Sequence, residues 1–263
     1  MKIATYNVNS VNARIENLSS WLKTENPDIV LLQEIKTEYN GFPFFDIQAC
    51  GYNACILGQK SYNGVAILSR GTIRIICENL PDFADEQSRY LEADVTIDKT
   101  VYRVASVYLP NGNPPYNDAS DTSKFEYKLR WTDAFLKHAQ ELSLLPQPVI
   151  IGGDFNVIMT DKDVYNPKLF ADNALFRPEV RTRLKQMSFL GFHDAFRSLH
   201  PDESGYTFWD YTANSLAADF GMRIDYLFLS APAADRLVSC RVDKAPRQSA
   251  KPSDHTPLVT ELS

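Results

Sequence analysis

Short apolar segments alternate with polar ones along most of the chain. Nine segments are rich in Val, Ile, Leu, Tyr and Phe and predict β-strands, at residues 2–8, 28–35, 64–70, 91–97, 102–110, 148–157, 223–230, 237–243 and 256–262. Some alternate polar and apolar positions, and others are apolar throughout, which is typical of strands covered on both faces. The pattern therefore predicts a protein dominated by sheets.

Three segments carry helical spacing instead. In residues 10–27, Val11, Ile15, Leu18 and Leu22 recur every three or four positions, and the segment ends at Asn26-Pro27 because a residue before proline avoids the α region. Residues 123–143 form a second predicted helix. Residues 177–191 form a third, closed by Gly191 in a C-terminal capping position.

The order of these elements indicates how they pack. Strands dominate the two ends of the chain, and helices lie between them, without a repeat or a low-complexity linker. This order favours two sheets packed on each other with helices outside, in a single domain over residues 1–263. Neither a GxGxxG nor a Walker A loop is present, which argues against a nucleotide cofactor.

Composition limits the class of protein. The 263 residues include 27 Lys and Arg against 33 Asp and Glu, a formal net charge of −6, which disfavours coating of nucleic acid through bulk charge. The four cysteines have neither CxxC nor zinc-site spacing, so we expect them to be reduced. No signal peptide or membrane span is predicted. We therefore expect a cytoplasmic protein.

Polar residues recur where the predicted strands end. They are Asn7, Glu34, Tyr108, Asp154, Asn156, Asp225, Asp254 and His255. Any single one could be a strand-end cap or a satisfied buried group. Burying so many carboxylates together without a cation would raise their pKa values or destabilise the fold. The set therefore predicts a cation site.

The residue types favour magnesium and phosphate-ester hydrolysis. Mg²⁺ prefers oxygen ligands, and Glu34 is the best candidate for direct ligation, with Asn7 and Asp254 offering further oxygens. Without an activated Ser or Cys motif, the nucleophile must be water, which needs a carboxylate to accept its proton. Asp154 suits that role. Because strand side chains alternate, Asn156 two residues later is expected to face the same phosphate.

The motifs LLQEIK, YLPNG, GGDFN, RIDYLFLS and SDHTPL, in this order, resemble the exonuclease III family of apurinic/apyrimidinic endonucleases, within the endonuclease/exonuclease/phosphatase superfamily. The resemblance covers essentially the whole chain. It implies a four-layer α/β sandwich of two mixed β-sheets packed face to face and flanked by helices. It also implies Mg²⁺, replaceable by Mn²⁺, and hydrolysis of double-stranded DNA at abasic sites or blocked 3′ ends by a monomeric bacterial enzyme with access to the nucleoid.

The resemblance also implies individual roles. Tyr108, Asp154, Asn156, Asp225 and His255 form the catalytic set, with His255 oriented by Asp225. The metal-binding set comprises Asn7, Glu34, Asp154, Asn156, Asp254 and His255.

Substrate-binding residues are expected on two surfaces. Because the segments YTFWDY and GMRID resemble the part of the family that encloses the abasic sugar, the resemblance implies that Phe208, Trp209 and Met222 form an apolar pocket for a flipped-out sugar lacking a base. The alternative is that they are ordinary core residues. Arg89, Arg177 and Arg181 are candidates for DNA phosphate contacts, as is Arg223. A solvated helix face is an equally good interpretation for any one of these arginines.

Three other functions remain open. A phosphoinositide or sphingomyelin phosphodiesterase, or a deadenylase, would use the same metal and Asp/His machinery, because function depends on loops carried by a shared fold. A catalytically inactive DNA-binding relative is the alternative from another class. The intact set of Glu34, Asp154, Asn156, Asp225 and His255 argues against inactivity.

Overall fold

Two six-stranded sheets form the centre of the computed structural model, which describes residues 1–114, 118–212 and 214–263. The strands are β1 Lys2–Asn7, β2 Ile29–Gln33, β3 Asn53–Leu57, β4 Val65–Ser69, β5 Thr72–Glu78, β6 Tyr90–Ile97, β7 Thr100–Tyr108, β8 Val149–Asp154, β9 His193–Asp194, β10 Asp225–Leu229, β11 Leu237–Val242 and β12 Leu258–Leu262. The helices are α1 Ile15–Glu25, α2 Phe44–Ala49, α3 Ser123–Ser143, α4 Pro178–Phe189, α5 Ala195–Leu199 and α6 Ala231–Ala234.

Both sheets are mixed. The first has the order β11-β12-β1-β2-β4-β3, and the second has the order β5-β6-β7-β8-β10-β9. Strands β1 and β2 are parallel, as are β7 and β8, whereas the other paired strands are antiparallel. The first and last strands, β1 and β12, pair directly, so both ends of the chain complete one sheet.

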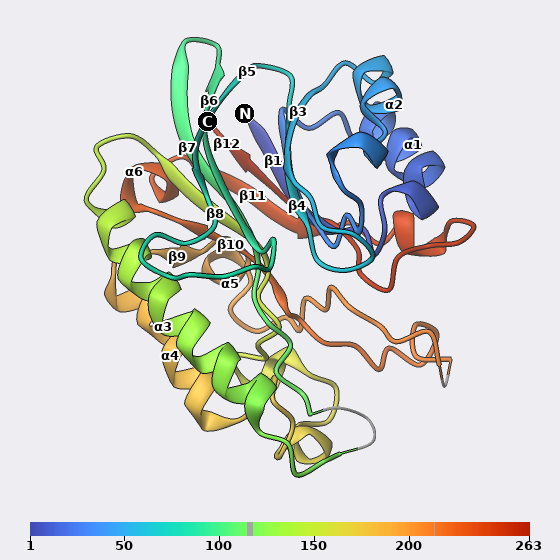
Figure 1. Cartoon of the computed structure of the whole chain (residues 1–263), viewed down its shortest axis with the longest axis vertical. Coiled ribbons are helices and arrows are strands. Elements are labelled where there is room, and N and C mark those ends of the chain that lie inside the picture. Colours follow the sequence, from blue (N-terminus) through green and yellow to red (C-terminus); the bar gives the residue numbers. More distant parts are fainter. Residues whose placement is uncertain (115–117, 213) are drawn as a thin grey trace.

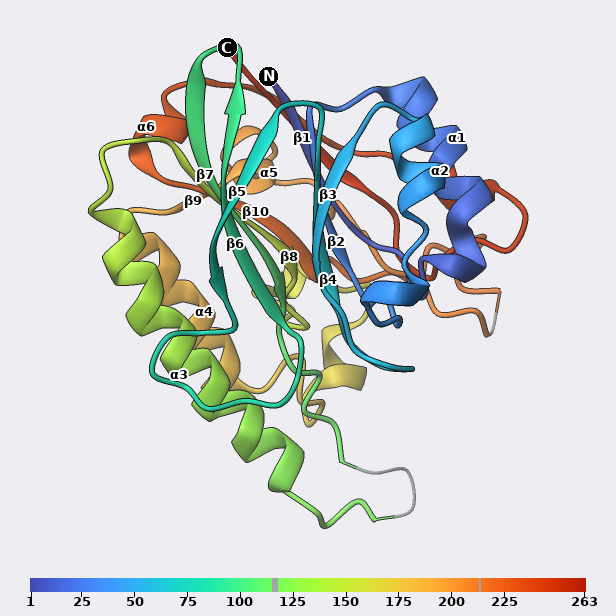
Figure 2. The same ribbon diagram turned by 45° about the horizontal axis from the view of Figure 1, so that its top comes forward.

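The sheets and helices form four layers (Figures 1 and 2). Helices α1 and α2 cover the outer face of the first sheet, and α3 and α4 cover the outer face of the second. Side chains that alternate along each strand fill the spaces between layers. In β8, for example, Ile150 packs between the sheets while Ile151 packs under the helices. The predicted four-layer sandwich is confirmed.

The predicted long elements are found with close boundaries. Helix α3 occupies residues 123–143 as predicted, and α1 ends where Asn26 takes a left-handed conformation before Pro27. Gly191 follows α4 with a φ of +86°, which agrees with its predicted capping position. The prediction missed β3, β5 and β9, and also the short helices α2, α5 and α6. These are short or, like β5, largely exposed, so they carry a weak hydrophobic pattern.

Two adjacent glycines let the centre of the second sheet approach its neighbours. A Cβ atom on Gly152 would lie 2.6 Å from Leu227 Cδ2 and 2.7 Å from Leu31 Cδ1, in the space between the sheets. A Cβ atom on Gly153 would lie 1.9 Å from the backbone oxygen of Val107 on β7. Larger residues here would displace the end of β8, which carries Asp154.

We expect Gly153→Ala to destabilise the protein more than Gly152→Ala. At position 152 the obstructing atoms are flexible side-chain ends, so the cost should be that of an overpacked core, about 1–3 kcal/mol. At position 153 the obstruction is backbone, which can move only if the β7–β8 pairing shifts. Urea unfolding of both variants measures the difference, and an equal or smaller loss for Gly153→Ala would contradict this account.

Candidate active site

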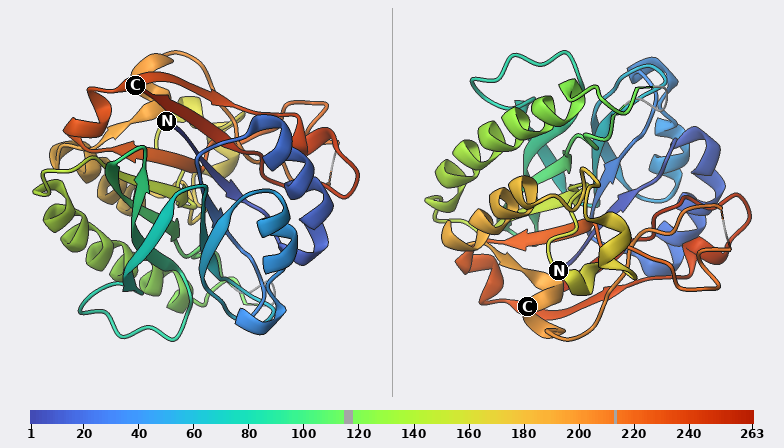
Figure 3. Two further views of the ribbon diagram at one scale, coloured as in Figure 1. Left: turned by 90° about the horizontal axis from the view of Figure 1, so that it is seen from above. Right: turned by 90° about the horizontal axis from the view of Figure 1, so that it is seen from below.

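A cavity of about 500 Å³ opens where the strands of both sheets end. Seen from below, loops from distant parts of the sequence surround this end, opposite the two chain termini (Figures 1 and 3). Six of the eight predicted strand-end residues line the cavity, and the other two, Asn7 and Asp225, are hydrogen-bonded to residues that line it. Its lining comprises Glu34, Tyr108, Asn111, Asn113, Asp154, Asn156, Tyr165, Phe170, Asn173, Leu175, Phe208, Asp210, Thr212, Ser215, Phe220, Met222, Ile224, Asp254 and His255.

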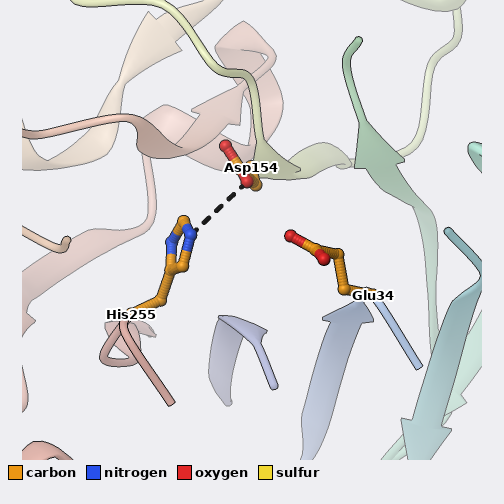
Figure 4. Close-up of side chains that lie close together, drawn as sticks. All are labelled: Glu34, Asp154 and His255. Atoms are coloured by element: carbon orange, nitrogen blue, oxygen red, sulfur yellow. Dashed lines mark ion pairs between the residues drawn. The ribbon is translucent and has the colours of Figure 1, made fainter. Parts of the chain in front are cut away.

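Glu34, Asp154 and His255 meet at one side of this cavity (Figure 4). Glu34 directly follows β2, Asp154 is the last residue of β8, and His255 precedes β12. One potential ligand atom from each lies within 4.8 Å of the others. Because β2 and β12 belong to one sheet and β8 to the other, only the packing of the two sheets brings these three side chains together.

The carboxylate of Asp154 is buried and surrounded by polar groups. Asn7 Nδ2 donates to Asp154 Oδ2 at 2.9 Å, and the backbone N–H of Asn156 donates to Oδ1 at 2.9 Å. Burial raises the pKa of Asp154 to about 7, the charge of His255 opposes this shift, and the negative charges of Asp225 and Glu34 add to it. A buried acid with this pKa is suited to exchange protons near neutral pH.

Asn156 also faces the cavity, but for a different reason from the one predicted. Strand β8 ends at Asp154, and Asn156 lies beyond it in a left-handed conformation with a φ of +48°. Strand alternation therefore does not aim this side chain. Its Nδ2 donates to the carbonyl of Leu109 at 2.9 Å, and its Oδ1 accepts from Asn111 Nδ2 at 3.2 Å.

His255 is held between two carboxylates. Its Nδ1 lies 2.8 Å from Asp225 Oδ2, and its Nε2 lies 3.6 Å from Asp154 Oδ2. Burial disfavours the charged imidazole, but the two carboxylates outweigh burial and raise the pKa of His255 to about 10. The predicted pairing of Asp225 with His255 is therefore present, and it favours the protonated form of the imidazole.

The sequence analysis missed Thr207, which fixes the Asp225–His255 pair. Its hydroxyl donates to Asp225 Oδ2 at 2.6 Å and accepts from the backbone N–H of Asp225 at 3.2 Å. Thr207 and Asp225 lie 18 residues apart, so no local motif joins them.

Asn7 and Glu34 are neighbours, as expected for strands β1 and β2. Asn7 Nδ2 donates to Glu34 Oε1 at 2.8 Å, and Lys36 Nζ lies 2.8 Å from Glu34 Oε2. Burial alone would raise the pKa of Glu34, but Lys36 and Asn7 outweigh it and lower the pKa. Lys36 was also missed, although its place two residues after Glu34 in QEIK was a usable signal.

Tyr108 and Asp254 lie at the edges of the group. Burial, together with Glu34 and Asp154, raises the pKa of Tyr108 well above its ordinary value, so its phenol stays neutral and can donate a hydrogen bond. Asp254 Oδ1 accepts from Asn9 Nδ2 at 3.0 Å. Asn9 in turn accepts from Lys36 Nζ at 2.6 Å, so Asn9 links Asp254 to the Glu34 side of the site.

The donor set fits a hard divalent cation. Two carboxylates lie together, and the burial of one of them raises its pKa, a cost that a cation would relieve. Glu34 and Asp154 would hold the cation, and the oxygens of Asp254 and Asn156 lie in the same cavity lining. Asn7 directs its Nδ2 at both carboxylates, while its Oδ1 accepts from the backbone N–H of Asn9 at 3.0 Å. His255 belongs to the same group, and because its Nδ1 faces Asp225 at 2.8 Å, only its Nε2 is left to face a cation or a phosphate.

Of the three residues predicted to form an apolar pocket, two line the cavity and one does not. Phe208 and Met222 line the cavity, where they lie beside Phe170, Leu175 and Ile224. Trp209, by contrast, is fully buried outside the lining, and its Nε1 donates to Asp219 Oδ1 at 3.1 Å. Adjacent residues of an extended segment point in opposite directions, so Phe208 and Trp209 cannot both face the cavity.

The arginines predicted to contact DNA lie outside the cavity lining. Arg89 stacks over the ring of Tyr108, 4.8 Å from its centroid, and so borders the site. Arg177 pairs with Glu179 at the start of α4, and Arg181 pairs with Asp161. The candidate Arg223 is wrong as a DNA contact, because only 1% of it is exposed.

Arg223 instead closes a buried ionic network. Its Nε lies 2.7 Å from Asp163 Oδ1, and its Nη1 lies 2.6 Å from Asp194 Oδ2. This network fixes the segment between Met222 and Asp225, which enters the cavity wall and begins β10.

The fold and the site define a phosphoesterase class, and comparison with known proteins agrees. The model of the Endonuclease/Exonuclease/phosphatase family matches residues 4–255, and the chain belongs to this family. Exodeoxyribonuclease III of Haemophilus influenzae is 29% identical over 270 residues, covering 100% of both chains. The predicted relationship to exonuclease III and the apurinic/apyrimidinic endonucleases is confirmed.

Two solved structures superpose closely. An AP endonuclease from Archaeoglobus fulgidus has a TM-score of 0.92 and 33% identity, with 100% of this chain and 99% of that chain covered. A 3′ phosphatase from Neisseria, bound to a product DNA hairpin, has a TM-score of 0.92 and 32% identity with the same coverage. The predicted assignment to the group of DNA nucleases that contains exodeoxyribonuclease III and the AP endonucleases is therefore confirmed.

In the metal-free protein we expect His255 to titrate near pH 10 and to return toward its ordinary pKa in Asp225→Asn. Because the folded-state pKa is raised, the stabilisation from this pair is fully present below about pH 6.5 and is lost as the pH rises toward 10. NMR titration of the His255 ring protons measures the first effect. Unfolding measurements on both proteins over this pH range measure the second. A wild-type ring that titrates near pH 6.5 would contradict the interpretation.

Proposed function

We propose that the protein is a metal-dependent DNA phosphodiesterase that cleaves the backbone 5′ to abasic sites. The proposal includes 3′-to-5′ exonuclease and 3′-phosphatase or phosphodiesterase activity on duplex DNA. The AP endonuclease and the DNA-bound 3′ phosphatase among its structural relatives support these activities.

The observation that carries the proposal is the pairing of two features in one cavity. Glu34, Asp154 and His255 form a charged group suited to a phosphate and its metal. Beside it, Phe208, Met222 and Ile224 provide an apolar wall suited to a sugar without its base. A substrate that carries a phosphodiester next to an exposed deoxyribose would satisfy both features.

Each polar residue has a role consistent with its surroundings. Asp154 accepts the proton of the attacking water, because its carboxylate is buried at the end of β8 and oriented by the Asn7 amide and the backbone N–H of Asn156. His255, protonated and oriented by Asp225, donates its Nε2 proton to a phosphate oxygen. Asn156 and Tyr108 donate further hydrogen bonds to the phosphate as negative charge develops on it.

We propose Mg²⁺ as the cofactor, with Mn²⁺ able to replace it. Carboxylate and amide oxygens dominate the donor set, which is the set that these hard cations prefer. When bound, the cation supplies positive charge that polarises the phosphate group. Glu34 and Asp154 would hold it, with Asn7 and Asp254 close by.

We further propose that residues 1–263 act as one domain and as a monomer on double-stranded DNA. Pairing of β1 with β12 supports the single domain, because the first and last strands complete the same sheet. None of the helices in the described ranges combines the length and apolarity needed to cross a bilayer.

The proposal is tested with a duplex that carries one tetrahydrofuran abasic site. We expect a nick directly 5′ to the lesion in the presence of Mg²⁺, and none with EDTA, because the phosphate charge would then lack its cation. Denaturing electrophoresis of the end-labelled strand locates the cut.

The same preparation is then assayed on an intact duplex, a 3′-phosphate end, a phosphoinositide and sphingomyelin. Intact duplex and the 3′-phosphate end measure the exonuclease and phosphatase activities. Hydrolysis of either lipid without DNA cleavage would refute the proposal, as would binding of the abasic duplex with no cleavage of any of these substrates.

Substitutions at Asp154 and Glu34 should have different effects. Asp154→Asn removes the proton acceptor as well as a charged metal ligand, so we expect activity to fall by about 10²–10⁴-fold even at saturating Mg²⁺, while DNA binding persists. Glu34→Gln removes a charged metal ligand, so we expect a higher Mg²⁺ concentration at half-maximal activity. Kinetic assays over a Mg²⁺ titration separate the two, and an unchanged Mg²⁺ dependence in Glu34→Gln would exclude it as a ligand.

A further inference from the structure

Lys128, on α3, is a fully buried lysine behind the active site. No carboxylate of the described residues lies within ion-pair distance of its ammonium group. Burying a charge without an opposite charge costs free energy of folding. An apolar side chain could pack the helix against the loops at a lower cost. The position therefore calls for a reason beyond packing.

The ammonium group is held by three backbone carbonyls. Lys128 Nζ donates to Asn111 at 2.9 Å, to Asn156 at 2.6 Å and to Ala174 at 3.1 Å. Burial lowers the pKa of Lys128 to about 7, although the negative charge of Asp154 opposes this. Three carbonyl acceptors need three N–H donors, which only the protonated amine has, so the geometry is that of the ammonium form.

These carbonyls belong to three separate segments that line the cavity. Asn111 follows β7, Asn156 follows β8, and Ala174 lies between Asn173 and Leu175, before α4. None of the three segments has regular strand pairing at this point, so strand hydrogen bonds do not fix their relative positions. Lys128 is a single group that contacts all three.

The contacts continue from backbone to side chains. Asn111 Nδ2 donates to Asn156 Oδ1 at 3.2 Å, so the segments that Lys128 joins also carry two interacting amides in the cavity wall. Gly112 has a φ of +81°, and a Cβ atom there would lie 2.6 Å from Lys128 Cδ. The loop after β7 thus packs closely on the lysine stem.

We propose that Lys128 is a positioning residue, which fixes the Asn111 and Asn156 amides relative to Asp154 by binding the backbone carbonyls of the loops that carry them. The inference rests on the proposed function, because it assigns Asn156 to the phosphate. Lys128 does not touch the substrate. Its removal should lower kcat and leave KM nearly unchanged, since it acts on groups that matter in the transition state.

The main test is a double-mutant cycle of Lys128→Met and Asn156→Ala. Methionine keeps much of the stem volume but supplies no donor. We expect kcat on the abasic duplex at saturating Mg²⁺ to fall by about 10–100-fold in Lys128→Met, the size of loss that slight misplacement of a catalytic group produces. In the Asn156→Ala background the same substitution should cost much less, because the group it positions is already absent.

Lys137→Met is the matched control. Lys137 lies on the same helix but is exposed and pairs with Asp82 on the surface, so its loss should leave kcat unchanged. An unchanged kcat in Lys128→Met would overturn the proposal. So would a double variant whose loss of kcat, as a free energy, equals the sum of the losses in Lys128→Met and Asn156→Ala. If Lys128→Met does not fold, as judged by circular dichroism, Lys128→Gln replaces it in the cycle.

A second measurement does not depend on catalysis. In ¹⁵N NMR spectra, Lys128→Met should shift or broaden the side-chain amide signals of Asn111 and Asn156 and leave that of Asn7 in place. Unchanged Asn111 and Asn156 signals would refute the positioning role. If wild-type protein fails to cut the abasic duplex but these signals respond as expected, the proposed function fails while the positioning role stands.

Discussion

The buried carboxylate of Asp154 is the constraint on which the rest of the site depends. A carboxylate excluded from water must be compensated, and this one receives donors from Asn7 and from the Asn156 backbone and lies near the charged ring of His255. These groups come from β1, from the loop after β8 and from the segment before β12. The groups that compensate the buried carboxylate of Asp154 therefore come from both sheets.

The sheet packing makes this convergence possible. Strands β1 and β2 run parallel in one sheet, and β7 and β8 run parallel in the other. The ends of β2, β7 and β8 reach the cavity, and Asn7 at the end of β1 donates to two of the residues that line it. Gly152 leaves room for Leu31 and Leu227 between the sheets, next to the strand end that carries Asp154. A rigid strand end is also a more exact support for a catalytic group than a loop.

Beyond the strand ends, the wall of the cavity is built from loops that need other supports. The ammonium group of Lys128 joins three of them through their carbonyls, and the Arg223 network with Asp163 and Asp194 fixes a fourth. Both supports are buried cations with long side chains. Lys128 reaches backbone carbonyls that no strand pairing satisfies, and Arg223 reaches two carboxylates. The site therefore combines residues fixed by sheets with residues fixed by buried charges.

By itself, the sequence determined the long elements, the layered architecture and the polar residues at strand ends, because periodicity and short motifs record which face of an element is buried. It did not determine that Phe208 rather than Trp209 faces the cavity, that Arg223 is buried, or that Asn156 reaches the site through a left-handed turn. Nor did it single out Thr207 or Lys128. Their partners lie 17 to 46 residues away along the chain, so only the tertiary packing of both sheets and their loops brings donor and acceptor within hydrogen-bonding distance.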